Sequence, residues 1–348
     1  MTESPTRMRE EIAEIPAAAE RFLAARAPLA AAAAALRAAD PRLIVTVARG
    51  SSDHAATYLK YAVEIVAGVP VAPVGPSVAS IYRRRLRLDG AACIGISQSG
   101  RSPDIVEMMQ SAGAGGALTL AVTNDAASPL AAAADHALAL EAGPERSVAA
   151  TKSFVASVLA GLALLAEWRE DAGLRAAVAA LPGQFASALD CDWTPLADRL
   201  VTASHAFVLG RGPGVAIASE MALKFKETSA IHAEAYSAAE VLHGPAALVG
   251  ARFPVLALAV PDAAEAQVIA TAERLAGQGA DVFLTGPGAG DFEARAGVTP
   301  LAAVAGVHPL TAPLVLVVSF YRFVEALARR RGLDPDAPPH LRKVTETL

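Results

Sequence analysis

Residues 97–102 place three serines, a glutamine and a glycine within one short stretch of the chain. Each serine hydroxyl can donate a hydrogen bond to a phosphate oxygen, and Gly100 can adopt positive φ or let the backbone approach a ligand closely. The stretch follows a short apolar run, residues 93–96, and precedes a helix-like pattern that starts at Asp104. A helix start presents free N–H groups and a dipole that favour an anion. The pattern indicates either a phosphate site or an ordinary strand-to-helix loop capped by Ser102.

A second group of reactive side chains lies in residues 223–245. Lys224 and Glu227 are spaced to share one face of a helix, so Glu227 could act as a general base that Lys224 keeps ionised. The simpler alternative is a solvated ion pair. His243 precedes a Gly-Pro turn, where a histidine can exchange protons near neutral pH but can equally be structural. The spacing of His232 and His243 matches no usual metal-ligand pattern, so we expect no metal.

Alternating strands and helices are expected to position both groups. Helices follow the strands in turn, which predicts an α/β fold with a parallel sheet. Before them, residues 7–39 read as a helical lead-in that Pro16 interrupts. Apolar or β-branched runs predict strands at residues 43–47, 69–74, 91–96, 117–123 and 137–140, and helical patterns cover 53–66, 104–112 and 152–171.

The pattern then recurs, with Arg211 in the place of Arg49. A duplicated α/β unit is therefore predicted, with the two copies joined near residues 181–183. The serines are absent from the second copy, where Val-Pro-Asp follows the strand that matches residues 93–97; this asymmetry favours a ligand in the first copy. In the second copy we expect strands at residues 206–210, 255–259 and 281–284 and helices at 264–276 and 311–330.

Composition narrows the class of protein. A chain of 348 residues that is 53% hydrophobic suggests two domains with a sizeable core. A net charge of −5 argues against nucleic acid as the main partner. The two cysteines, Cys93 and Cys191, form no disulfide framework and fit a reducing cytoplasm. We expect no signal peptide at the N-terminus, and the longest apolar run, residues 154–168, is too short to cross a bilayer comfortably.

Several motifs, taken together, resemble one family. They are residues 97–102, 148–152, 223–227, 232–236 and 243–245. The family is the isomerase part of glucosamine-6-phosphate synthase with its stand-alone relatives, built from two sugar-isomerase (SIS) domains. The resemblance implies two tandem SIS domains, each a doubly wound, flavodoxin-like parallel sheet flanked by helices. The implied boundaries are a helical lead-in at 1–40, SIS domain 1 at 41–180, SIS domain 2 at 195–330 and an active-site tail at 331–348.

The resemblance also implies a role for each matching residue. Glu227 would move a proton between C1 and C2 of the sugar, with Lys224 in support. His243 would assist ring opening in the site of a neighbouring subunit, which implies a homodimer, and Lys343 would contact the open-chain sugar. No cofactor or metal is implied. The sugar phosphate would be bound by Ser52, Ser97, Gln98, Ser99 and Ser102, and the sugar would be bordered by Val148, Ala149, Ala150 and Thr151.

Some positions depart from the synthase. Arg49 and Ala150 stand where it has small or hydroxyl residues, and Leu242 replaces a lysine. The first cysteine is Cys93, in an expected strand, so we expect no release of ammonia from glutamine. The sequence therefore predicts a cytoplasmic deaminase that converts glucosamine 6-phosphate and water to fructose 6-phosphate and ammonia. The alternatives are a deaminase or deglycase of another amino- or amine-linked hexose phosphate, and a non-catalytic sugar-phosphate sensor.

Overall fold

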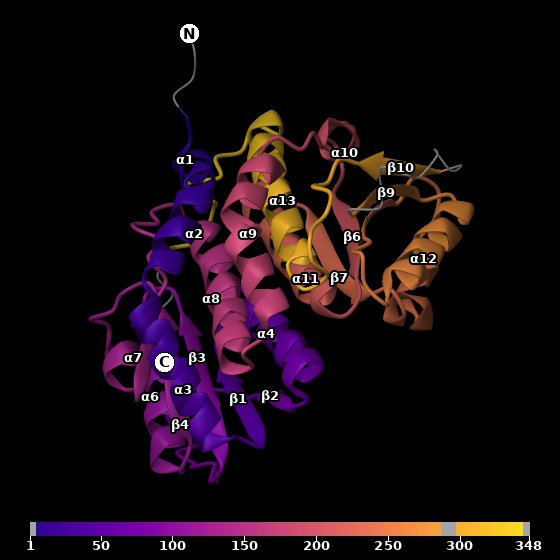
Figure 1. Ribbon diagram of the computed structural model, residues 1–348. Coiled ribbons are helices and arrows are strands. Elements are labelled where there is room, and N and C mark those ends of the chain that lie inside the picture. The colour runs from indigo at the N-terminus through magenta and orange to yellow at the C-terminus, as the bar shows by residue number, and fades with distance from the viewer. Residues whose placement is uncertain (1–4, 287–296, 344–348) are drawn as a thin grey trace. The chain divides into compact units, whose positions relative to one another are not determined.

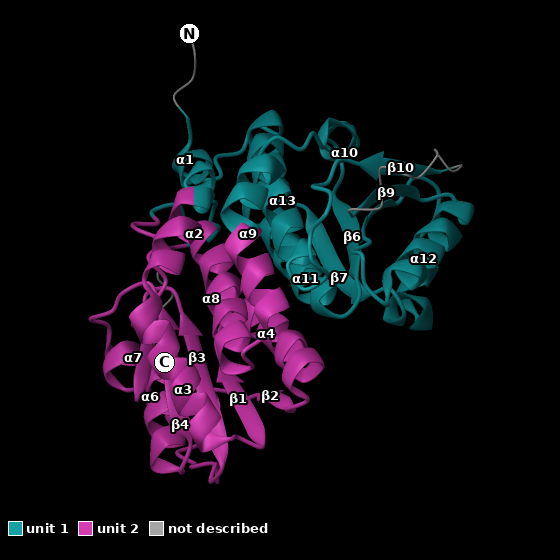
Figure 2. Ribbon diagram, viewed as in Figure 1, with its two compact units in different colours: residues 1–16, 146–151, 181–341 teal, residues 17–145, 152–180, 342–348 magenta. Residues whose placement is uncertain are grey.

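The computed structural model describes residues 5–286 and 297–343, which form two compact units (Figure 1). Figure 2 colours unit 1 teal and unit 2 magenta. Helix α9 (Ala172–Ala188) runs through the segment where we expected a join, because its Leu181 and Phe185 are fully buried despite the proline between them. The division between the units falls within this helix. Unit 1 comprises residues 1–16, 146–151 and 181–341, and unit 2 comprises residues 17–145, 152–180 and 342–348.

Unit 2 contains a parallel five-stranded sheet with helices on both faces. The predicted strands and helices of this half are confirmed. Helices α3, α4 and α8 pack on one face, and α5, α6 and α7 pack on the other. In spatial order the strands are β2 (Val71–Pro73), β1 (Leu43–Val47), β3 (Ala91–Ser97), β4 (Leu118–Thr123) and β5 (His136–Ala139). The helices are α3 (Arg26–Ala39), α4 (Ser51–Ala67), α5 (Ser77–Ser80), α6 (Pro103–Ala114), α7 (Pro129–Ala132) and α8 (Lys152–Trp168).

Unit 1 repeats this topology, so the predicted duplication is confirmed. Two edge strands, β7 and β10, were not predicted, because β7 is only partly buried and carries polar side chains among its alanines. In spatial order the strands are β7 (His232–Ser237), β6 (His205–Gly210), β8 (Pro254–Leu258), β9 (Asp281–Thr285) and β10 (Val298–Leu301). The longer helices are α11 (Pro213–Ser229), α12 (Glu265–Gly277) and α13 (Ala312–Arg330), and the short ones are α10 (Thr194–Leu200), η1 (Glu240–His243) and η2 (Pro245–Leu248).

The lead-in is three helices rather than one: α1 (Arg7–Ala13), α2 (Ile15–Ala24) and α3. The first break lies at Glu14, two residues before Pro16, and a second at Ala25 was not predicted. The Asp336 side chain accepts hydrogen bonds from the first two N–H groups of α1 (2.8 Å each). These bonds attach the start of α1 to the C-terminal part of unit 1. Within the described ranges, no single helix is long and apolar enough to cross a membrane; α2 and α3 meet that requirement only as a pair bent by 65°.

Each sheet has one point where its connections diverge. In unit 2 the chain leaves β1 toward β2 and returns on the other side to β3, although β1 and β3 are hydrogen-bonded neighbours. The loops at the carboxyl ends of these two strands therefore diverge, and the position between them, called the crevice below, is the usual ligand position in open α/β sheets. The equivalent point in unit 1 lies between β6 and β8.

Candidate active site

The serine loop is a tight turn at the carboxyl end of β3 (Figure 1). The Ser97 hydroxyl accepts a hydrogen bond from the Gly100 N–H (3.2 Å), and the Ser99 hydroxyl accepts one from the Arg101 N–H (3.3 Å). The Gly100 carbonyl accepts a further bond from the Leu130 N–H (3.0 Å), which ties the turn to α7. Ser97 is buried and Ser99 is half-buried. The backbone therefore holds the hydroxyls in place while leaving their own protons to donate.

Ser102 occupies the N-cap of α6, but the alternative of an ordinary capped loop is wrong in one respect. In the described structure its side chain makes no capping hydrogen bond. Asp104 instead satisfies a helix-start donor, because its Oδ1 accepts from the Ile105 N–H (2.9 Å). The half-buried Ser102 hydroxyl is thus available to an incoming group at the positive end of the helix.

Ser52 lies at the helix start that follows the neighbouring strand, β1. It is the second residue of α4, which starts after Gly50, a residue with φ of 55°. Because β1 and β3 pair in parallel, their carboxyl ends lie side by side, and the helices α4 and α6 both begin there. The structure therefore brings together the residues that were predicted to bind the phosphate, at the divergence point of unit 2. They are Ser52, Ser97, Gln98, Ser99 and Ser102.

Gly100 is required in this turn for two independent reasons. Its φ is 61°, and a Cβ atom would lie 2.2 Å from Ser128 Oγ and 2.8 Å from Thr123 Oγ1. We expect Gly100→Ala to weaken sugar-phosphate binding by at least tenfold, since the loop must shift. Gly90→Ala is the matched control, because Gly90 also has positive φ (72°) but a Cβ there would meet nothing within 4 Å. Calorimetric titration with a hexose 6-phosphate checks both; equal affinity for the two variants would contradict the assignment.

Lys343, the predicted tail residue, is not a solvated lysine. Its Nζ lies 2.9 Å from Oε2 of Glu145, whose side chain is fully buried in unit 2. Glu145 also accepts hydrogen bonds from the N–H (3.0 Å) and hydroxyl (2.6 Å) of Ser153, at the start of α8. Burial by itself raises the pKa of Glu145, but Lys343 and the Ser153 bonds outweigh it and leave the pKa below its usual value. Glu145 was not predicted as a site residue. The one feature of the sequence that pointed to it is the position of an acidic residue a few residues before a helix start.

A pH experiment tests this pair. Because the folded pKa of Glu145 is lowered, the stabilisation is present above the ordinary glutamate pKa, about 4.3, and is lost as pH falls through the lower folded value. We expect the ¹³Cε resonance of Lys343 to keep its bound position at pH 5 and to shift toward that of free lysine below about pH 4. Lys343→Arg assigns the signal. Glu145→Gln should show the free position already at pH 7, and an unchanged signal in that variant would contradict the contact.

The loop predicted to border the sugar belongs to unit 1 and is anchored by α1. Glu11 is buried and accepts hydrogen bonds from the N–H groups of Arg146 and Ser147 and from the Ser147 hydroxyl. The Ser147 hydroxyl also contacts the Ala149 carbonyl oxygen (3.2 Å). This scaffold fixes the residues that follow. Val148 and Ala150 are half-buried, while Ala149 and Thr151 are buried.

The predicted base lies in a buried network on α11. Lys224 contacts Oε2 of Glu227 (2.5 Å) and Oε1 of Glu220 (3.4 Å), and the Tyr321 hydroxyl donates to Glu220 (2.9 Å). The side chains of Lys224 and Glu220 are 0% exposed and that of Glu227 is 21% exposed, so the alternative of a solvated pair is wrong. Burial lowers the Lys224 pKa, but the two carboxylates outweigh it and the pKa is raised. The ammonium therefore stays charged and forms a close ion pair with Glu227.

Two members of this network were not predicted. Glu220 lies one helical turn before Lys224, and that spacing was a readable signal in the sequence. Tyr321 comes from α13, far along the chain, and no local pattern points to it. Glu227 is the member of the network that solvent or a substrate can reach.

His243 lies at the end of η1, exposed, and its ring makes no hydrogen bond to any residue the structure describes. Gly244 follows with φ of 151°, which orients the short helices η1 and η2. The predicted site residues thus divide between the units. Unit 2 holds the serines predicted to bind phosphate and Lys343, and unit 1 holds Lys224, Glu227, His243 and the 148–151 loop.

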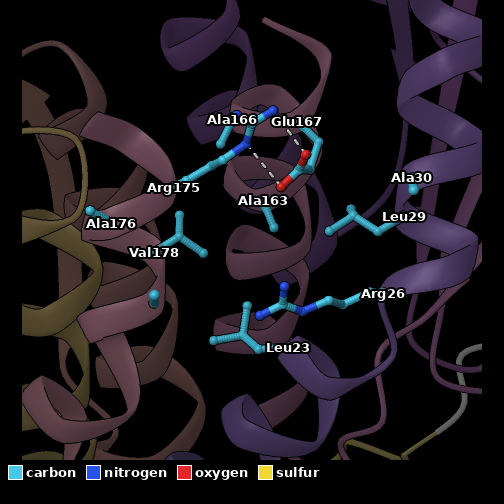
Figure 3. A pocket seen from close by; sticks show the side chains of 11 residues that line it. Leu23, Arg26, Leu29, Ala30, Ala163, Ala166, Glu167, Arg175, Ala176 and Val178 are labelled. Atoms are coloured by element: carbon cyan, nitrogen blue, oxygen red, sulfur yellow. Dashed lines mark hydrogen bonds and ion pairs between the residues drawn. The ribbon is translucent and has the colours of Figure 1, made fainter. Parts of the chain in front are cut away.

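A hollow of about 420 Å³ lies elsewhere in unit 2, between α2, α3, α8 and α9 (Figure 3). Its walls are Leu29, Ala163 and Val178, with an ion pair between Arg175 and Glu167 at 3.0 Å. It includes none of the predicted site residues. Among the described residues, no group of three or more His, Cys, Asp or Glu side chains could hold a metal ion.

Comparison with known proteins agrees with this architecture. The family model of the SIS domain matches residues 38–167 and 199–286. The chain is 34% identical over 317 residues to glutamine–fructose-6-phosphate aminotransferase (isomerizing) of Symbiobacterium thermophilum, which covers 87% of this chain and 51% of the relative. The chain spans about half the length of the curated relatives it matches.

Two solved structures are similar over nearly the whole chain. A Silicibacter pomeroyi protein, named for an inferred phosphosugar isomerase activity, is 53% identical with a TM-score of 0.89, covering 95% of this chain and 100% of its own. The C-terminal domain of glucosamine-fructose-6-phosphate aminotransferase from Francisella tularensis is 27% identical with a TM-score of 0.85, covering 96% and 99%.

Proposed function

Because the chain belongs to the SIS domain family, we propose that it is a sugar-phosphate isomerase that deaminates an aminosugar phosphate. The substrate would be glucosamine 6-phosphate, and the products would be fructose 6-phosphate and ammonia. The observation that carries the proposal is the state of Glu227: a partly exposed carboxylate backed by a fully buried ammonium. Such a group can take a proton from carbon and return it.

The proposed reaction divides the work among the predicted residues. The serine loop and Ser52 hold the phosphate, and His243 assists opening of the sugar ring. Glu227 removes the C2 proton of the open-chain aldehyde and delivers a proton to C1, which converts the 2-amino aldose to a C2 imine. Water then adds to C2, the C2–N bond breaks, and nitrogen leaves as ammonia. Lys343, held by Glu145, would stand beside the open-chain sugar.

The direction of the reaction follows from mass action. Relatives at about one-third identity are named as aminotransferases that use glutamine and fructose 6-phosphate. Where water is abundant and ammonia is scarce, the equilibrium between the aminosugar phosphate and fructose 6-phosphate lies toward fructose 6-phosphate and ammonia. This supports deamination as the reaction of the present chain.

The proposal includes an assembly and a compartment. We assign phosphate binding to residues 41–180, proton transfer to 195–330 and closure of the site to 331–348. His243 would enter the site of a neighbouring subunit in a homodimer; its exposure and the 68% exposure of nearby Leu248 support this. Burial raises the pKa of the Cys93 thiol to about 12, so it is unreactive, and the described cysteines are both free, as in a reducing cytoplasm.

A direct assay tests the proposal. The protein is incubated with glucosamine 6-phosphate, and ammonia and fructose 6-phosphate are measured by separate coupled enzymes. We expect both to appear in equal amounts. A panel of other amino- and amine-linked hexose 6-phosphates is run in parallel, because Ala150 and Leu242 depart from the synthase pattern. Turnover of a different sugar in the panel would identify that sugar as the substrate. Binding of a sugar phosphate without turnover of any of them would favour a sensor.

A further inference from the structure

Arg49 lies at the divergence point of unit 2 but belongs to none of the groups assigned above. It follows β1, and its Nε (2.7 Å) and Nη2 both donate to Oδ2 of Asp104. Asp104 is in the first turn of α6, directly after Ser102 and Pro103, and its side chain is 2% exposed. The Arg49 side chain is 46% exposed, and its Nη1 donates to no group in the described chain. One end of the guanidinium is therefore held while the other faces outward.

The positive charge of Arg49 interacts with an acidic residue at each of the two helix starts that border the crevice. On the α6 side it is bonded to Asp104. On the α4 side it acts on Asp53: burial raises the pKa of Asp53, while the charges of His54 and Arg49 oppose the rise. Arg101, the arginine inside the serine loop, is instead paired with Asp125 (2.8 Å) and is 63% exposed. Arg49, unlike Arg101, is thus held at the start of α6.

A phosphate monoester creates an electrostatic problem at this position. It carries a charge of about −1.5 to −2 at neutral pH. The serines that would bind it are neutral, and the buried carboxylate of Asp104 lies at the same helix start. Two neighbouring anions repel each other strongly in a partly desolvated crevice. Arg49 neutralises Asp104 and retains an unused donor for a phosphate oxygen, a charge-assisted bond of the kind arginine forms well.

We propose that Arg49, clamped by Asp104, is a specificity-determining residue that makes the serine cradle selective for a phosphorylated sugar. This rests on the proposed function, since it assumes that a sugar phosphate binds at the serine loop. The simpler explanation is structural: the ion pair only ties the β1 loop to α6. The two explanations differ in what happens when both partners are neutralised together.

The test compares Arg49→Met, Asp104→Asn and the double variant. Asparagine keeps an oxygen for the Ile105 N–H. The probe is glucitol 6-phosphate, an open-chain sugar phosphate without a carbonyl, with glucitol as its neutral counterpart. We expect Arg49→Met to raise the Kd for glucitol 6-phosphate by about 10–100-fold and to leave the Kd for glucitol unchanged. The double variant should regain the thermal midpoint of the wild type but remain at least tenfold weaker in binding.

Arg101→Met is the matched control, because Arg101 lies in the serine loop, is 63% exposed and is paired with Asp125 rather than Asp104. It should change the Kd less than twofold. If the double variant regains both stability and affinity, Arg49 is structural only and the inference is overturned. If wild-type protein binds no glucitol 6-phosphate at all, the proposed function fails first. Wild-type affinity in Arg49→Met would overturn the inference and leave the proposed function standing.

Discussion

Glu227→Gln should lower kcat on glucosamine 6-phosphate by ~10²–10⁴-fold, the usual effect of removing a well-placed general base. Glutamine keeps the shape of the side chain, and the residues proposed to bind the phosphate lie in the other unit. The Kd for glucitol 6-phosphate should therefore stay within about twofold of the wild type. This pattern, a lost kcat with retained binding, indicates an interaction made in the transition state.

Glu265→Gln serves as the control for this experiment. Glu265 starts α12 in the same unit, away from the network of Lys224, and its neutralisation should leave kcat unchanged. A rate close to wild type for Glu227→Gln would show that another group moves the proton. The exchange of the C2 proton with solvent deuterium, followed by NMR, gives an independent readout, because this exchange should stop in the variant even where ring opening continues.

Lys224→Met should have the largest effect on stability. It leaves Glu220 fully buried without its cation, and breaking a buried ion pair in this way costs about 3–5 kcal/mol. For a chain of this size we expect a fall in thermal midpoint on the order of 10 °C. Activity should fall as well, because Glu227 loses the buried ammonium with which it pairs. Differential scanning calorimetry at pH 7 measures the first effect.

The double variant Glu220→Gln/Lys224→Met separates the effect on stability from the effect on activity. Removing the buried charge of Glu220 should restore several degrees of thermal midpoint, while activity stays low. Lys226→Met is the matched control, an exposed lysine of the same helix, and should move the midpoint by no more than about 2 °C. A small shift for Lys224→Met, equal to that control, would show that the network is not stabilising.

Much of the fold followed from local patterns. The strands with apolar or β-branched runs, and helices α4, α6, α8, α12 and α13, were predicted because residue types and periodicity act over a few neighbours. The edge strand β7 was missed because half-exposed positions need no apolar pattern. The division between the units falls at residue 181, near the predicted join, but it lies inside helix α9, because burial of α9 outweighs the cost of Pro182 within the helix.

The sequence by itself determined the parallel α/β architecture, its duplication and the serine loop at the end of a strand, because these depend on neighbours along the chain. The tertiary structure alone decided which polar and charged groups far apart in the chain meet. Arg49 and Asp104 are 55 residues apart, Glu220 and Tyr321 are 101 apart, and Glu145 and Lys343 are 198 apart. Such pairs form because folding buries a charge that must find a partner, and the partner's position in the chain is set by the packing of helices and strands, which no local pattern records.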